Sequence, residues 1–89
     1  MQVINQDEID NLRRDIQRLG TKNAEGKYVV KFGVLYKDER IQQYFEVFYV
    51  NIRTALVDTL KAAKKLNVLD FQDQMLLKGA NDNAEIILK

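Results

Sequence analysis

The most regular pattern of apolar and polar positions lies between Asp38 and Asn67, a stretch that contains neither proline nor glycine. Its apolar residues recur every three or four positions, which is the period of an α-helix with one buried face. They are Ile41, Phe45, Phe48, Ile52, Leu56, Leu60 and Ala63. Asp38 is predicted to cap the start, because its carboxylate can accept hydrogen bonds from the free N–H groups of the first turn. The pattern predicts one long helix or two helices joined by a bend.

A second helical pattern covers residues 6–19. Its apolar stripe has the same spacing and consists of Ile9, Leu12, Ile16 and Leu19. Asn5 and Glu8 stand three residues apart, as in a capping box at a helix start. Gly20 follows the last apolar residue and is well placed to end the helix in the left-handed conformation. The sequence therefore predicts a capped first helix.

Shorter patterns predict strands on both sides of the long helical stretch. In residues 28–36 (YVVKFGVLY) β-branched and aromatic residues dominate, and every second residue from Val30 to Tyr36 is apolar, which favours a strand. Gly33 falls on the other face of this strand, where it could mark a close approach by another backbone. After the helical stretch, residues 68–71 predict a short extended piece.

The last residues of the chain predict a β-hairpin. Residues 75–79 and 84–88 are apolar stretches, and the GANDN sequence at their junction has the composition of a turn. The predicted order is thus helix, strand, two separate or fused helices, and two strands. It indicates one α+β domain over residues 1–89, with three helices packed on a small antiparallel sheet. A winged-helix domain has this order, with the hairpin as its wing, although other small α+β domains share it.

The composition limits the chemistry that the chain can perform. Its 89 residues include no histidine, cysteine or serine. Serine and cysteine nucleophiles, a histidine base and zinc sites of the Cys/His kind are therefore excluded. Residues 81–85 (NDNAE) lack the ligand spacing of a calcium loop and fit a turn instead. We expect a protein without catalytic activity, cofactor or metal.

Charge and hydropathy limit the expected cellular location of the protein and the classes of partner that it could bind. Hydrophobic residues make up 46% of the chain and charged residues 30%, which is typical of a soluble globular protein. No apolar run approaches the ~20 residues that a membrane span needs, and we expect no signal peptide in the acidic, polar first residues. The absence of cysteine fits the cytoplasm. A net charge of +1 argues against a dedicated polyanion binder.

Four sequence motifs together resemble the Costars family, small proteins similar to the C-terminal domain of the actin-binding Rho-activating protein of striated muscle. The motifs are RLG-x-KNA-x-G (18–26), VKFGVL (30–35), LV-x-TLKAAKK (56–65) and LL-x-G…D…I-x-L (76–88). They occur here in the family's order. The resemblance implies a winged-helix-like fold, a cytosolic location and a role in actin-filament organisation rather than catalysis.

The chain departs from the family pattern most clearly at residues 47–54. There VFYVNIRT intervenes between Glu46 and Ala55, where the family usually runs directly from FE into ALV. Eight further residues add about 12 Å of helical rise. They could fuse the second and third helices into a rod that invites domain swapping, or form extra turns and a bend. We favour the bend and a monomer, because proteins commonly absorb insertions in connections. Smaller departures are Asp58, Asp73 and Asn81, where the family has Gly, Gly and His.

The candidate binding residues are four lysines and one tyrosine. Helical spacing places Lys61, Lys64 and Lys65 together near a helix C-terminus, with Lys78 of the predicted hairpin as a possible neighbour. Such a cluster suits an acidic surface, either the carboxylate-rich face of actin or a phosphate backbone, although a solvated helix end also favours lysine. Tyr49 is expected to be the most exposed aromatic residue and hence an interface anchor.

We therefore expect a non-catalytic cytosolic protein that binds actin filaments or a regulator of actin filaments, without contact to a membrane. Direct and indirect action on actin both remain open. A nucleic-acid-binding winged helix is the alternative, but Asp58 would repel phosphate and residues 55–66 contain no arginine, asparagine or glutamine to read bases. A third hypothesis is an adaptor that recognises a folded partner through the hydrophobic insertion at 47–54.

Overall fold

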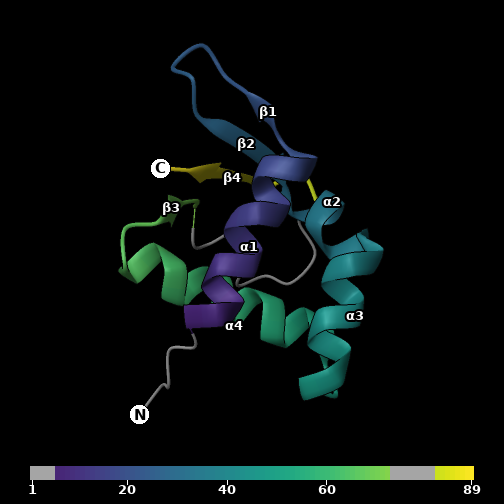
Figure 1. Cartoon of the computed structure of the whole chain (residues 1–89). Coiled ribbons are helices and arrows are strands. Elements are labelled where there is room, and N and C mark those ends of the chain that lie inside the picture. Colours follow the sequence, from purple (N-terminus) through teal and green to yellow (C-terminus); the bar gives the residue numbers. More distant parts are fainter. Residues whose placement is uncertain (1–5, 73–81) are drawn as a thin grey trace.

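The computed structural model describes residues 6–72 and 82–89, and within them the chain forms four helices and four short strands (Figure 1). In chain order these elements are α1 (Gln6–Leu19), β1 (Thr21–Lys22), β2 (Tyr28–Lys31), α2 (Phe32–Lys37), α3 (Glu39–Phe48), α4 (Ile52–Lys65), β3 (Leu69–Asp70) and β4 (Glu85–Leu88). The α+β class and the small antiparallel sheet are confirmed. The helices number four rather than the three expected, because α2 replaces part of a predicted strand.

The strands form one antiparallel sheet in the order β1-β2-β4-β3. Val30 pairs with Ile86 across β2 and β4, and Leu69 pairs with Leu88 across β3 and β4. Helix α1 contacts β2 and β4, and α4 runs from the end of α3 towards β3 (Figure 1). The helices therefore cover the sheet and leave the lower end of α3 projecting away from it.

Most apolar residues of the predicted stripes meet in one core, but Phe48, which its spacing placed on the buried face, is 63% exposed. Ile9, Leu12 and Ile16 of α1 are at most 2% exposed, and Leu56 and Leu60 of α4 are fully buried. Burying each such side chain stabilises the fold by about 1.5–3 kcal/mol relative to leaving it in water. The helical period in both stretches is thus the sequence feature that positions the core.

The strand predicted for residues 28–36 is wrong beyond Lys31. Phe32 and Gly33 still donate backbone hydrogen bonds, to the carbonyl oxygens of Ala84 and Asp82, but from Phe32 onward the chain turns into α2. Phe32 and Tyr36 are four residues apart, so the apolar pattern of this segment also fits a helix. A Cβ at Gly33 would come within 2.7 Å of the Asp82 Cβ, which confirms the predicted close approach at this glycine.

Of the two alternatives for the long helical stretch, the single fused helix does not occur, because the stretch divides into α3 and α4 around Tyr49–Asn51. Tyr49 has extended backbone angles, and the Asn51 side chain accepts a hydrogen bond from the Thr54 N–H at 3.1 Å, which starts α4 as an N-cap. The expected bend is confirmed. The domain swap depended on a fused rod and loses that basis, while the monomeric state stays a prediction.

Asp38 caps α3 as predicted and also ties it to α1. Its Oδ2 accepts from the Ile41 N–H at 3.1 Å and from the Arg18 guanidinium at 2.6 Å. Burial raises the pKa of this carboxyl, but the hydrogen bonds from Arg18 and Ile41 outweigh burial and lower the pKa on balance. The cap therefore also fixes how α3 sits against the first helix.

The C-terminal prediction is confirmed where the structure describes it. The extended piece after α4 is β3, and the last predicted strand is β4. The other predicted hairpin strand, at 75–79, lies outside the described residues, as do Asp73, Lys78 and Asn81. The winged-helix arrangement, whose wing includes that segment, stays a prediction.

Candidate functional site

The candidate lysines gather where α4 ends, but they differ in their surroundings. Lys65 is exposed and Lys61 is half-buried. Lys64 turns towards the segment after β3, where its Nζ donates to the Phe71 carbonyl oxygen and lies 4.9 Å from the centre of the Phe71 ring. It also pairs with Asp70 Oδ1 at 3.5 Å. Lys64 therefore fastens α4 to this segment, while Lys61 and Lys65 lie on successive turns of α4.

A further lysine at this end was not predicted as a site residue. Lys89 follows β4, its N–H donates to the Val68 carbonyl oxygen, and its Nζ donates to Asn67 Oδ1 at 2.6 Å. The pairing of β4 with β3 brings it beside the end of α4. The order of apolar stretches alone does not reveal which strands pair, so the position of Lys89 beside α4 could not be predicted from the sequence. We call Lys61, Lys64, Lys65 and Lys89 the lysine end.

Tyr49 lies at the other end of α4, in the bend that follows α3. It is 41% exposed, but Phe48 at 63% is more exposed, so Tyr49 is accessible without being the most exposed aromatic residue. The Tyr49 hydroxyl donates to Glu8 Oε1 at 2.5 Å. This hydrogen bond, with burial as a second cause, raises the pKa of Tyr49 to about 12. The ring of Tyr49 is therefore accessible to a partner, whereas its hydroxyl is already engaged within the protein.

Glu8 holds this arrangement from the first turn of α1. It is only 7% exposed, and its second oxygen, Oε2, accepts from the Thr59 hydroxyl at 3.3 Å. The sequence suggested Glu8 as one half of a capping box, whose other half, Asn5, lies outside the described residues. Its contacts with α3 and α4 could not be predicted, because they join residues 41 and 51 positions apart.

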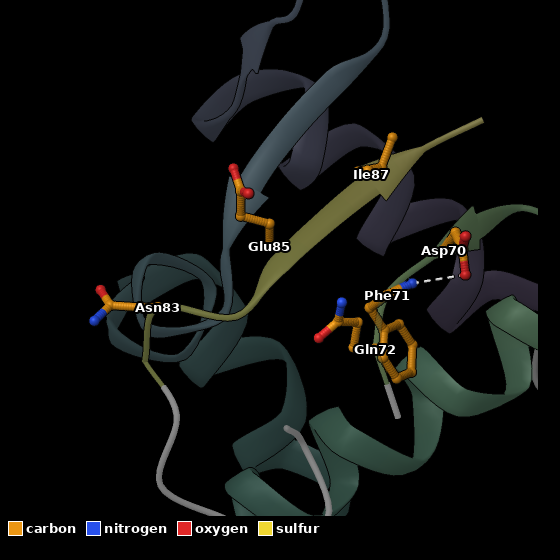
Figure 2. A pocket seen from close by; sticks show the side chains of 6 residues that line it. All are labelled: Asp70, Phe71, Gln72, Asn83, Glu85 and Ile87. Atoms are coloured by element: carbon orange, nitrogen blue, oxygen red, sulfur yellow. Dashed lines mark hydrogen bonds between the residues drawn. The ribbon is translucent and has the colours of Figure 1, made fainter. Parts of the chain in front are cut away.

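A pocket of about 420 Å³ opens between β4 and the segment after β3 (Figure 2). Its lining includes Asp70, Phe71, Asn83 and Glu85. Figure 2 shows Asn83 and Asp70 on opposite sides, so the polar groups do not converge on a common point as they do in small-molecule sites. Within residues 6–72 and 82–89 no group of three or more acidic side chains is arranged to hold a metal ion. The pocket therefore offers no recognisable chemistry.

Five aromatic residues that could in principle stack on nucleic-acid bases belong to the core or its edge instead. Phe32, Phe45 and Phe71 are at most 5% exposed, and Tyr28 and Tyr36 pack against the core from its edge. None of the helices in the described parts of the chain has the length and apolar character needed to cross a bilayer. The lysine end and the bend around Tyr49 are thus the two surfaces that remain as candidates.

A sequence model of the Costars family matches residues 4–89. The chain belongs to the Costars family. The similar Costars family protein ABRACL of Coturnix coturnix is 48% identical over 81 residues, which are 91% of this chain and 90% of that protein. Protein costars of Dictyostelium discoideum is 46% identical over 81 residues, covering 91% and 89%. These matches confirm the resemblance carried by the four motifs.

The fold also matches that of a solved structure. The solution structure of human HSPC280 protein covers 93% of this chain and 88% of its own, with 42% identity and a TM-score of 0.69. The Costars match spans every described element from α1 to β4. Three residues of the lysine end, Lys61, Lys64 and Lys65, lie within a motif shared with the family, whereas the bend around Tyr49 falls in residues 47–54, where the chain departs from the family pattern.

Proposed function

We propose that the protein is a non-catalytic cytosolic component of the actin cytoskeleton that binds actin filaments or a regulator of them. Membership of the Costars family is the observation that carries the proposal. The four motifs of this chain resemble that family, and the resemblance implies a role in organising actin filaments. The absence of histidine, cysteine and serine supports a binding function rather than catalysis.

The lysine end is the surface we propose for the contact with actin. Lys65 is exposed, Lys61 is half-buried one turn earlier, and Lys89 lies beyond the end of α4. Such a group of cations is attracted to a surface rich in carboxylates, and salt screens the attraction because the charges are exposed. Lys64 stabilises this surface indirectly, because its hydrogen bond to the Phe71 carbonyl oxygen joins the end of α4 to the segment after β3. Lys78 remains a proposed neighbour that lies outside the described residues.

The alternative of nucleic-acid binding gains little support from this surface. Asp58 is exposed on α4 one turn before Lys61 and would repel phosphate. Lys64 is already paired with Asp70, which lowers the positive charge that the surface offers. A net charge of +1 leaves little further attraction for a polyanion.

The proposal is tested by reversing charge at two lysines while leaving Lys64 in place. Lys61→Glu with Lys65→Glu is expected to weaken co-sedimentation with filamentous actin by about tenfold, because attraction becomes repulsion. Lys31→Glu with Lys37→Glu makes the same charge change at exposed positions on β2 and α2 and serves as the control. Both variants should keep the melting temperature of the parent. Equal weakening by both pairs would remove the lysine end as the contact surface.

A further inference from the structure

The bend between α3 and α4 exposes four consecutive apolar side chains. Their exposed fractions are 76% for Val47, 63% for Phe48, 41% for Tyr49 and 106% for Val50. We call these four residues the apolar tip. It lies at the end of α3 that projects away from the sheet (Figure 1). Contiguous apolar surface of this kind usually marks a place where another molecule binds, because leaving it in water is costly.

The apolar tip is held in a defined shape by contacts to the rest of the protein. The Tyr49 N–H donates to the Phe45 carbonyl oxygen at 2.8 Å, and the Tyr49 hydroxyl is bonded to Glu8. The ring of Phe48 lies 5.6 Å from that of Tyr44 and 6.5 Å from that of Tyr49, measured between centroids. A surface whose side chains are already ordered loses little conformational entropy on binding.

The charges around the apolar tip are negative. Residues 41–52 contain no lysine or arginine, and Glu46 is exposed beside Val47. The hydrogen bond to Glu8 is the largest cause of the raised pKa of Tyr49, and burial is the largest cause of the raised pKa of Tyr44; the charge of Asp58 adds to the first and that of Asp7 to the second, as expected for acidic groups nearby.

The cation that follows the apolar tip in sequence does not offset these charges at the surface. Arg53 is half-buried, and its guanidinium lies 5.5 and 5.3 Å from the ring centres of Phe32 and Tyr36. It therefore points to the core side of α4. The apolar tip is an uncharged surface with an acidic surround.

We propose that the apolar tip docks a basic amphipathic helix of another protein. The apolar face of that helix would cover Phe48 and Val50, and its lysines or arginines would face Glu46, Asp7 and Asp58. This pairing follows from charge complementarity, which sets orientation and excludes wrong partners. A second copy of this chain is disfavoured, because a symmetric contact would bring the two acidic surrounds together. This surface is separate from the lysine end and does not depend on the proposed contact with actin.

The test uses a fluorescent synthetic peptide of about 18 residues, long enough to form a helix, with leucines along one face and lysines along the other. Anisotropy titration of the full chain should give saturable binding that weakens as salt rises. A matched peptide with glutamate in place of every lysine should bind at least tenfold more weakly. Equal binding of the two peptides, or no saturable binding of the basic one, would overturn the proposal.

Two variants locate the site. Phe48→Asn with Val50→Asn should weaken binding of the basic peptide about tenfold, since buried apolar anchors dominate such contacts. Val34→Asn with Leu66→Asn removes apolar groups of 43% and 44% exposure elsewhere and should leave binding within about twofold. Unchanged binding after the first pair would contradict the proposal. So would a concentration-dependent dimer in sedimentation that the first pair abolishes, because a second copy would then occupy the tip.

Discussion

At the scale of single residues, the buried carboxylate of Glu8 connects three helices. Glu8 lies in α1. Its carboxylate accepts one hydrogen bond from the hydroxyl of Tyr49, just after α3, and another from the hydroxyl of Thr59 in α4. Among the described residues, Glu8 and Thr59 are the buried polar side chains. A buried carboxylate is stable only while its oxygens are hydrogen-bonded. The position of the bend therefore depends on one acidic residue near the start of the chain.

Removing the Tyr49 hydroxyl should cost measurable stability. Tyr49→Phe keeps the ring but leaves Glu8 Oε1 without this donor, and we expect a loss of about 1–2 kcal/mol in the free energy of unfolding. Urea denaturation measures it. Tyr28→Phe is the control, since Tyr28 is half-buried at the edge of the core and lies in β2 rather than in the bend. Equal stability of Tyr49→Phe and the parent would show that the hydrogen bond contributes nothing.

The raised pKa of the Tyr49 hydroxyl predicts that the protein loses stability in alkaline solution. This pKa is about 12 in the folded protein, raised by the hydrogen bond to Glu8 and by burial, against about 10 in the unfolded chain. The folded state thus holds this proton more tightly, so the stabilisation is full below about pH 10 and is lost as pH rises towards 12. Unfolding free energies measured across this range should fall more steeply for the parent than for Tyr49→Phe. Parallel pH profiles would contradict the assignment.

At the scale of elements, the bend between α3 and α4 is set by a cap rather than by a helix-breaking residue. Asn51 has extended backbone angles and its side chain accepts from the Thr54 N–H. The stretch contains neither proline nor glycine, so no residue in it forbids a continuous helix. The side-chain cap and the Tyr49–Glu8 hydrogen bond together stabilise two helices over one.

Replacing the cap should therefore lower stability. Asn51→Ala is expected to cost about 1 kcal/mol, because the N–H of Thr54 loses its acceptor, whereas Asn51→Asp keeps an acceptor and should stay close to the parent. Chemical denaturation of the three proteins provides the comparison. If Asn51→Ala and Asn51→Asp were equally stable, the cap would not determine where α4 starts.

The elements that could be predicted are those with a single interpretation of their apolar pattern. The stripes of α1 and α4 and the cap at Asp38 were predictable from spacing and residue type alone. Residues 32–36 were not, since their apolar positions fit a strand and a helix equally, and tertiary contacts with Asp82 and Ala84 decide between them. Phe48 and Ile52 keep the helical period across the bend, so periodicity does not reveal it.

Only part of the candidate site was predictable, because some of its contacts join residues that are distant in sequence. Helical spacing correctly placed Lys61 and Lys65 near one another, but it could not show that Lys64 is bound to Phe71 or that strand pairing brings Lys89 close. Likewise the exposure of Tyr49 followed from its place in the insertion, whereas its contact with Glu8 depends on how α1 packs. Contacts between residues distant in sequence account for what was missed.

At the scale of the whole molecule, the two proposed surfaces lie at opposite ends of α4. The helix has 14 residues, so the apolar tip and the lysine end are separated by about 20 Å along it. One end is basic and the other is apolar with acidic neighbours. The two contacts should therefore be independent, and Phe48→Asn with Val50→Asn should leave co-sedimentation with actin unchanged. A parallel loss of both activities would indicate one shared surface.

Co-sedimentation of the purified protein with filamentous actin over a range of salt tests the central claim most directly. We expect saturable pelleting at low ionic strength that fades as salt screens the lysine end. Absence of saturable pelleting at low salt, with a known filament-binding protein pelleting in the same assay, would contradict direct contact between the lysine end and the filament.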